Sequence, residues 1–124
     1  FVKNENPLKI YGGNQTRAFC HISDALKALK LIMELDQTDK MIINIGNDEE
    51  EVKINYLAEL IIKLINNNNS IVNKKAPEGS TDRRCPDISL LKSLGYNPTV
   101  SLQEGLKPMI QWYKNEFGKL DDKK

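Results

Sequence analysis

The chain has 124 residues, 40% of them hydrophobic and 28% charged, and a formal net charge of +1. This length allows one small domain, and the composition is that of a globular protein. The balanced charge argues against the broad basic surface that nucleic-acid phosphates require, and no apolar run approaches membrane-spanning length, so we expect neither a nucleic-acid nor a membrane partner.

A short strand and a tight turn are the first predicted elements. Residues 8–11 (Leu-Lys-Ile-Tyr) form a strand-like run that the glycine pair 12–13 stops, because glycine tolerates the positive φ of a tight turn. A loop of residues 14–16 follows. The glycine pair belongs to no G-x-G-x-x-G or P-loop pattern, so the turn is favoured over a phosphate-binding role.

A helix and a buried strand are predicted next. Apolar side chains recur at helical spacing from residue 23 to about 35, with Ser23 as the N-cap and Asp24 near the positive end of the helix dipole. Residues 41–45 (Met-Ile-Ile-Asn-Ile) are almost continuously apolar, which is typical of a strand that is buried on both faces of a parallel sheet.

The middle of the chain predicts a second helix, a strand and a long loop. Residues 54–65 are amphipathic at helical spacing, and the asparagines at 66–69 suit a left-handed C-cap. Residues 71–72 are a candidate strand. Residues 74–85 carry Pro, Gly, Ser, Thr and charge without periodicity, which predicts an exposed loop.

Two helices are predicted near the C-terminus. Asp87 can cap a short helix that reaches residue 94, and the S-x-x-E pattern of residues 101–104 is a capping box for a final helix. Pro108 lies inside that helix and predicts a kink or a late helix start, because proline lacks the amide donor. Residues 119–124 read as a polar tail.

Cysteine and histidine offer little chemistry. Cys20 and Cys85 show neither C-x-x-C spacing nor a dense cysteine framework, which predicts free thiols in a reducing, cytoplasmic compartment. With His21 as the single histidine, no ligand set at metal-binding spacing exists, so we predict no metal. Cys20 and His21 are neighbours that would point to opposite faces of a strand, so packing is favoured over a nucleophile pair.

The arginines are the residues best suited to an anion. Arg17 follows the glycine turn, and Arg83 and Arg84 lie in the polar loop. A guanidinium is planar, permanently charged and matched to phosphate oxygens. Spacing alone nevertheless favours solvated surface charge or ion pairs with nearby carboxylates. The candidate partners are Asp24, Asp82 and Asp87.

Four segments in a fixed order carry a resemblance to a known family. They are residues 8–24, 43–47 (Ile-Asn-Ile-Gly-Asn), 83–88 (Arg-Arg-Cys-Pro-Asp-Ile) and 94–106. Together they resemble the C-terminal part of NAD-dependent nucleotide-sugar epimerases and dehydratases, which are extended short-chain dehydrogenases. The likeness is nearest to UDP-glucuronate decarboxylases, also called UDP-xylose synthases. The dTDP-glucose 4,6-dehydratases and UDP-glucose 4-epimerases share this framework and stay open as alternatives.

The resemblance implies the fold and the division of the chain. We expect an α/β, Rossmann-type arrangement of three to four helices with short strands and an incomplete parallel sheet. Residues 1–118 would be the C-terminal nucleotide-sugar-binding region, ahead of the polar tail. The NAD-binding part would lie outside this sequence, because no dinucleotide loop is present and no tyrosine has a lysine four positions later. NAD would then belong to the full-length enzyme, and this chain alone would neither bind it nor be active.

The resemblance also implies contacts with a UDP-sugar or a related nucleotide sugar. Ile10 and Tyr11 match the strand that lies along the nucleotide base. Gln15 and Arg17 match the segment that grips ribose and phosphate.

Two further positions follow from the segment 83–88. Arg84 matches an arginine that reaches the diphosphate and is, in the decarboxylase branch, a candidate proton donor. Asp87 matches a position near the ribose in epimerases, although helix capping explains it equally well. His21 and Cys85 depart from the family pattern, which usually has an aromatic and a basic residue there.

A second hypothesis of another class is a non-enzymatic interaction module. Residues 41–45 and the edges of an incomplete sheet could pair with another chain, including a second copy in a homodimer.

Overall fold

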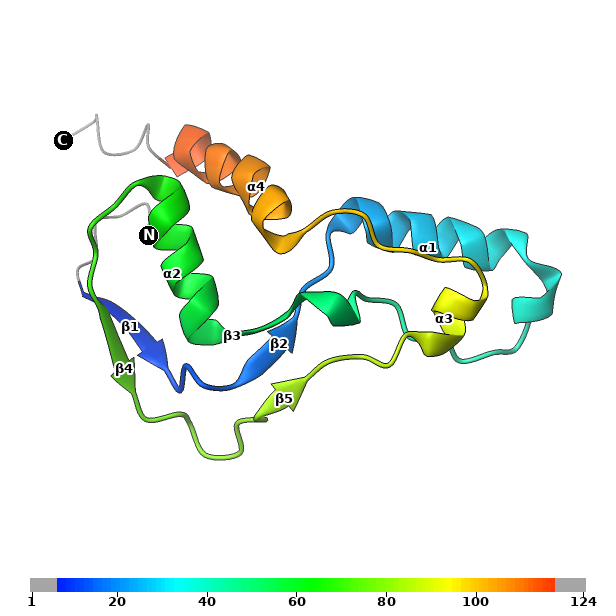
Figure 1. Ribbon diagram of the computed structural model, residues 1–124, viewed down its shortest axis with the longest axis horizontal. Coiled ribbons are helices and arrows are strands. Elements are labelled where there is room, and N and C mark those ends of the chain that lie inside the picture. The colour runs from blue at the N-terminus through cyan, green and yellow to red at the C-terminus, as the bar shows by residue number, and fades with distance from the viewer. Residues whose placement is uncertain (1–6, 118–124) are drawn as a thin grey trace.

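Short strands alternate with helices along residues 7–117, the part that the computed structural model describes (Figure 1). In chain order the elements are β1 (Leu8–Tyr11), β2 (Thr16–Ala18), α1 (Ile22–Glu34), the 3-10 helices η1 (Asp36–Thr38) and η2 (Asp48–Glu50), β3 (Glu51–Lys53), α2 (Ile54–Ile65), β4 (Ile71–Lys74), β5 (Arg83–Arg84), α3 (Ser89–Ser93) and α4 (Leu102–Phe117).

The strands form two small sheets. In one, β1 pairs in parallel with β4, from Leu8 opposite Ile71 to Tyr11 opposite Lys74. In the other, β2 lies between β3, which is antiparallel to it, and β5, which is parallel to it. The same two stretches of chain therefore run side by side twice, first as β1 with β4 and then as β2 with β5. The turn at 12–15 and the loop at 75–82 separate the two pairings, and the incomplete parallel sheet is confirmed.

Helix α2 is formed as predicted. It spans Ile54–Ile65 and buries Ala58 and Leu60, while Ile10 of the neighbouring strand β1 is also buried. Asn66 ends the helix with φ 55°, and its amide donates to the carbonyls of Ile62 and Lys63. The asparagine run thus supplies the left-handed C-cap that its residue type favours.

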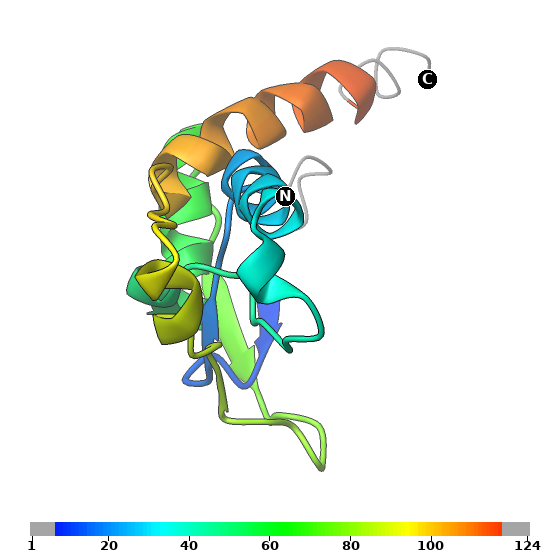
Figure 2. The same cartoon turned by 90° about the vertical axis from the view of Figure 1, so that its right-hand side faces the viewer.

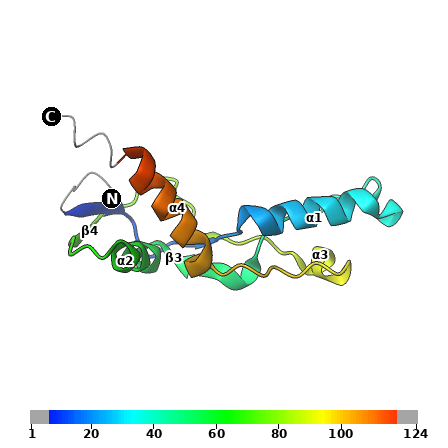
Figure 3. The ribbon, with the colours of Figure 1, turned by 90° about the horizontal axis from the view of Figure 1, so that it is seen from above.

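The molecule is elongated, and a hydrophobic core lies at the end opposite to helix α2 (Figures 1 and 3). Figure 2 looks along the molecule from that end, where α1 and α3 lie. The buried members of the core come from α1, α3 and the residues that flank α3. They are Ala28, Ile88, Leu91 and Tyr96, with Leu31, Ile32, Ile43 and Ile45 packed against them.

The prediction of a strand buried on both faces at residues 41–45 is wrong. The segment has no ladder partner among the described residues, and its side chains alternate. Ile43 and Ile45 pack against the core, whereas Ile42 is 95% exposed. An apolar run shows that a segment can be buried, but burial of both faces needs neighbouring strands that residues 7–117 do not supply.

Two helix starts also differ from expectation. The N-cap of α1 is His21 rather than Ser23, because the Nδ1 atom of His21 accepts a hydrogen bond from the Ser23 amide at 3.3 Å. Helix α4 contains Pro108 but starts at Leu102, so of the two predicted effects of this proline, a kink or a late helix start, the late start is wrong. The capping box explains the early start: the Ser101 hydroxyl donates to the Glu104 carboxylate at 2.6 Å, and the Glu104 amide donates back to that hydroxyl.

Asp24 joins the start of α1 to the segment that leads into α4. Its side chain is fully buried. It accepts hydrogen bonds from the backbone amides of Thr99 and Val100 at 2.9 Å, from the Thr99 hydroxyl at 3.0 Å and from the Lys27 ammonium at 2.8 Å. Burial alone would raise the pKa of Asp24, but these hydrogen bonds outweigh it and hold the pKa well below its ordinary value.

We expect Asp24→Asn to lower the free energy of unfolding at neutral pH by roughly 2–3 kcal/mol, because an amide cannot replace a carboxylate that accepts several hydrogen bonds. A carboxyl group with a lowered folded-state pKa stabilises the fold above its unfolded pKa and loses that contribution as the pH falls through the folded value. The difference between wild type and variant should therefore shrink below about pH 4. Urea unfolding across pH measures it, with the exposed Asp36→Asn as control; a difference independent of pH would contradict this role.

Candidate functional site

Strand register places two arginines on one face of the small sheet. In the parallel pairing of β2 with β5, Arg17 lies opposite Arg84 and Thr16 lies opposite Arg83. Successive side chains of a strand point to opposite faces, so Arg17 and Arg84 share one face while Arg83 projects from the other. The neighbours Arg83 and Arg84 thus lie on opposite faces of the sheet, whereas Arg17 and Arg84, which are far apart in the sequence, lie on the same face.

The guanidinium groups of this pair both reach Thr81, in the loop before β5. The Nη2 atom of Arg17 donates to the Thr81 carbonyl at 2.8 Å, and Nη2 of Arg84 lies 3.4 Å from the Thr81 hydroxyl. Arg17 also donates to the carbonyl of Thr16 at 2.6 Å. Within residues 7–117 neither guanidinium forms an ion pair. Two cations without an ion-pair partner at one point on the surface make a candidate anion site, because planar guanidinium groups match the geometry of phosphate oxygens.

The opposite face carries a neutralised cation. Arg83 forms a two-pronged ion pair with Glu51 of β3, with Nε and Nη2 at 2.9 and 2.7 Å from the carboxylate oxygens. The Thr16 hydroxyl donates to the same carboxylate. Hydrogen bonds from Arg83 and then Thr16 lower the pKa of Glu51, and Glu51 raises the pKa of Arg83.

The carboxylate in this pair was not foreseen from the sequence. The sequence indicates Asp24, Asp82 and Asp87 as ion-pair partners of the arginines, whereas Arg83 pairs with Glu51. Glu51 lies 32 residues from Arg83 in the sequence, and only the pairing of β2 with both neighbours brings them together.

The turn between β1 and β2 accepts hydrogen bonds from the N-terminal amides of helix α2. The side-chain oxygen of Gln15 accepts from the Gly13 amide at 2.6 Å, and its nitrogen donates to the Tyr11 carbonyl at 3.0 Å. The carbonyls of Gly13 and Gln15 accept from the first two amides of α2, those of Asn55 and Ile54. Since the turn leads into a strand and its polar atoms are engaged, it does not fit the pyrophosphate of a dinucleotide. Both polar atoms of Gln15 are used in the turn.

The remaining predicted site residues differ in accessibility. Ile10 is buried, so its side chain is unavailable to a ligand, whereas Tyr11 is 58% exposed at the end of β1. Asp87 is exposed and accepts from the Ser89 amide at 2.9 Å, which lowers its pKa. The structure thus brings Arg17 and Arg84 together and leaves Tyr11 open. Asp87 accepts a hydrogen bond from the first amide of α3, although the N-cap of that helix is Ile88, which makes no side-chain capping hydrogen bond.

A hollow of about 430 Å³ adjoins Arg84 and contains both cysteines. Both are free thiols. The Sγ atom of Cys20 lies 3.6 Å from the His21 carbonyl and 3.8 Å from the Tyr96 hydroxyl, consistent with packing. Burial, followed by the adjacent Glu51 carboxylate, raises the pKa of Cys85 and makes its thiolate scarce. Across residues 7–117, no group of His, Cys, Asp and Glu side chains could hold a metal ion.

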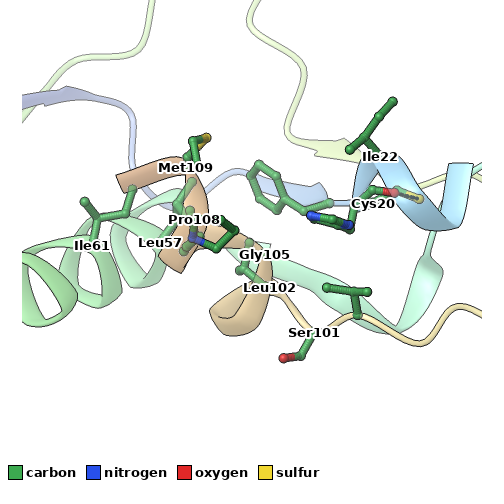
Figure 4. Close-up of a pocket in the computed structure, with 13 residues that line it drawn as sticks. Cys20, Ile22, Leu57, Ile61, Ser101, Leu102, Gly105, Pro108 and Met109 are labelled. Atoms are coloured by element: carbon green, nitrogen blue, oxygen red, sulfur yellow. Dashed lines mark hydrogen bonds between the residues drawn. The ribbon is translucent and has the colours of Figure 1, made fainter. Parts of the chain in front are cut away.

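A second hollow, of about 580 Å³, lies between α2, α4 and the start of α1 (Figure 4). Leu57 and Ile61 of α2 face Leu102, Pro108 and Met109 of α4 across it. The lining is mostly apolar, and among the described residues it includes no lysine or arginine, so this hollow is less suited to a nucleotide diphosphate than the face of Arg17 and Arg84. No helix in the described range is long and apolar enough to cross a membrane.

The fold is that of a segment of an extended short-chain dehydrogenase. The solved UDP-glucose 4-epimerase of Thermotoga maritima, in complex with UDP-glucose, superposes with a TM-score of 0.81 at 28% identity, over 92% of this chain and 36% of that one. UDP-glucuronic acid 4-epimerase of Bacillus cereus, with UDP-glucuronic acid and NAD, gives 0.80 at 29% identity, over 90% and 36% of the two chains.

Sequence comparison identifies the same family. UDP-glucuronic acid decarboxylase 6 of Arabidopsis thaliana is 39% identical over 107 residues, which are 86% of this chain and 30% of that protein. No protein-family model matches. The chain belongs to the family of NAD-dependent UDP-sugar epimerases and decarboxylases, and it spans about a third of the length of these relatives.

We expect Gly13→Ala to destabilise the fold more than Gly95→Ala. Both glycines have a positive φ, 102° and 98°, so alanine is strained at either position by roughly 1–2 kcal/mol. A methyl group at position 13 would also collide with the Asn55 amide, whereas position 95 faces open space. Thermal unfolding of both variants isolates that collision. Equal losses would show that the contact between the turn and α2 can relax.

Proposed function

We propose that this chain binds the diphosphate of a UDP-sugar between Arg17 and Arg84. The observation that carries the proposal is the pairing of these residues in register on one face, with both guanidinium groups at Thr81 and without an ion-pair partner in residues 7–117. Phosphate oxygens match the donor geometry of guanidinium. The exposed ring of Tyr11, at the end of β1, is proposed to contact the nucleotide base.

We further propose a role in an enzyme that resembles UDP-glucuronate decarboxylase, with a UDP-glucose 4-epimerase or a dTDP-glucose 4,6-dehydratase as alternatives. The 39% identity with a decarboxylase and the structural likeness to an epimerase support the first two of these; the dehydratase rests on the resemblance of the sequence segments alone. NAD supplies the redox chemistry of such enzymes when bound. Its binding residues would lie outside this chain, so the chain alone would be inactive. The free thiols of Cys20 and Cys85 favour a cytoplasmic enzyme.

The proposed contribution of this chain is placement. Two guanidinium groups that hold the diphosphate leave the sugar with few orientations, which lowers the entropic cost of bringing it to the reacting groups. Arg84 is also the candidate proton donor. Because an arginine stays protonated at neutral pH, binding through charge is the role we assign to it first.

We expect Arg17→Ala and Arg84→Ala each to weaken the binding of UDP about tenfold or more, because a hydrogen bond to a charged group contributes about 1.5–3 kcal/mol. Isothermal titration calorimetry of the 124-residue chain with UDP and UDP-glucuronate measures the effect. Lys53→Ala is the matched control: it removes a cation from the adjacent strand β3, at a position paired with Thr16 on the other face. The proposal fails if wild type binds neither ligand, or if the control weakens binding as much as the arginine variants.

Association with another polypeptide is the second candidate function, and a specific observation favours it. Residues 41–45 are extended without a ladder partner in the described part of the chain, and Ile42 is 95% exposed. Although this segment is not a strand, backbone that lies outside any ladder beside an exposed apolar side chain could pair with another chain. If the chain forms a dimer without ligand, Ile42→Asp should shift it to monomer in size-exclusion chromatography with light scattering. A monomeric wild type at high concentration would rule out self-association.

A further inference from the structure

We infer that Glu51 is a positioning residue for Arg84, to which it is linked through Arg83 on the opposite face of the sheet. The inference rests on the proposed function, because Arg84 matters only if an anion binds there. Glu51 belongs to β3 and Arg83 to β5, and the strand between them is β2. The ion pair therefore crosses the middle strand and ties the two edges together.

Few other interactions fix the position of strand β5. It consists of two residues, both exposed, at the end of an irregular loop. The β2–β5 ladder covers two residue pairs, and one more backbone hydrogen bond joins the Thr16 amide to the Asp82 carbonyl at 2.8 Å. A ladder this short gives little resistance to fraying or to a shift in register.

The Glu51 carboxylate is well placed to fix the orientation of β5. It is 19% exposed, against 66% for Arg83, and it receives hydrogen bonds from Arg83 and from the Thr16 hydroxyl. A guanidinium held at two nitrogens has a defined plane and direction. With Arg83 fixed on this face, the alternation of the strand directs the next side chain, Arg84, to the face of Arg17.

The direction in which neutralising Glu51 changes the affinity for phosphate distinguishes a positioning role from a purely electrostatic one. Glu51 is an anion, so neutralising it should strengthen the binding of any phosphate if long-range charge were its only influence. Positioning predicts the reverse, because loss of the tie lets Arg84 leave its place beside Arg17. Thr16→Val removes a hydrogen bond to the same carboxylate without changing any charge.

The test is calorimetry of the 124-residue chain with UDP and with uridine. We expect Glu51→Gln to weaken UDP binding roughly fivefold and Thr16→Val to weaken it less, in keeping with the modest energy of a surface ion pair. Uridine binding should not change, because it has no phosphate. The matched control is Glu34→Gln, which removes the exposed ion pair with Lys30 at the end of α1. Circular dichroism and thermal unfolding verify that each variant is folded.

Two further variants test whether the effect passes through Arg84. In an Arg84→Ala background, Glu51→Gln should cause no additional loss, whereas an independent structural effect would add to it. Exchanging the charges, Glu51→Arg with Arg83→Glu, should restore much of the affinity. UDP binding by Glu51→Gln that equals or exceeds wild type, while Arg84→Ala still weakens it, would overturn the inference and leave the proposed function intact. A wild type that does not bind UDP would overturn the proposed function itself.

Discussion

The parallel pairing of β2 with β5 is the constraint on which the candidate site depends. This ladder sets Arg17 against Arg84, and strand alternation sends Arg83 to the other face. A shift by one residue would exchange the faces of Arg83 and Arg84, leaving the anion site with the wrong arginine. The ladder covers only two residue pairs, and the ion pair of Arg83 with Glu51 adds a side-chain restraint to it.

The buried carboxylate of Asp24 links the two ends of the elongated molecule. Burial of an ionised carboxylate is costly unless hydrogen bonds replace its water. Asp24 satisfies this condition with donors from residues 99 and 100 and from Lys27, and thereby joins α1 to the segment that leads into α4. Because α4 also contacts α2, this buried carboxylate connects the core around α1 and α3 to the helices beside β1 and β4.

Local signals in the sequence predicted the local structure. Helical periodicity identified α2, and the S-x-x-E pattern identified the start of α4. Two errors had local causes too: a continuous apolar run cannot tell one buried face from two, and His21 is an uncommon N-cap. The ion pair of Arg83 with Glu51 could not be predicted, because its 32-residue separation is closed only by strand register. Residue type indicates Arg17, Arg83 and Arg84 as anion-binding candidates, and the resemblance selects Arg17 and Arg84 among them. That these two share one face follows only from the structure.

Two titratable groups, the Cys85 thiol in the hollow beside Arg84 and the Tyr96 phenol next to Cys20 and Gly46 of that hollow, are poorly suited to proton transfer. The Tyr96 phenol is buried and donates to the Gly46 carbonyl at 3.1 Å; burial, then the neighbouring Cys20, raises its pKa. Cys85 also has a raised pKa, so at neutral pH both groups stay protonated and are poor bases or nucleophiles. Arginine is a cation throughout the physiological range. Arg17 and Arg84 can bind and orient an anion, whereas Tyr96 and Cys85 offer little means to take up a proton, which supports placement as the role we propose for this chain.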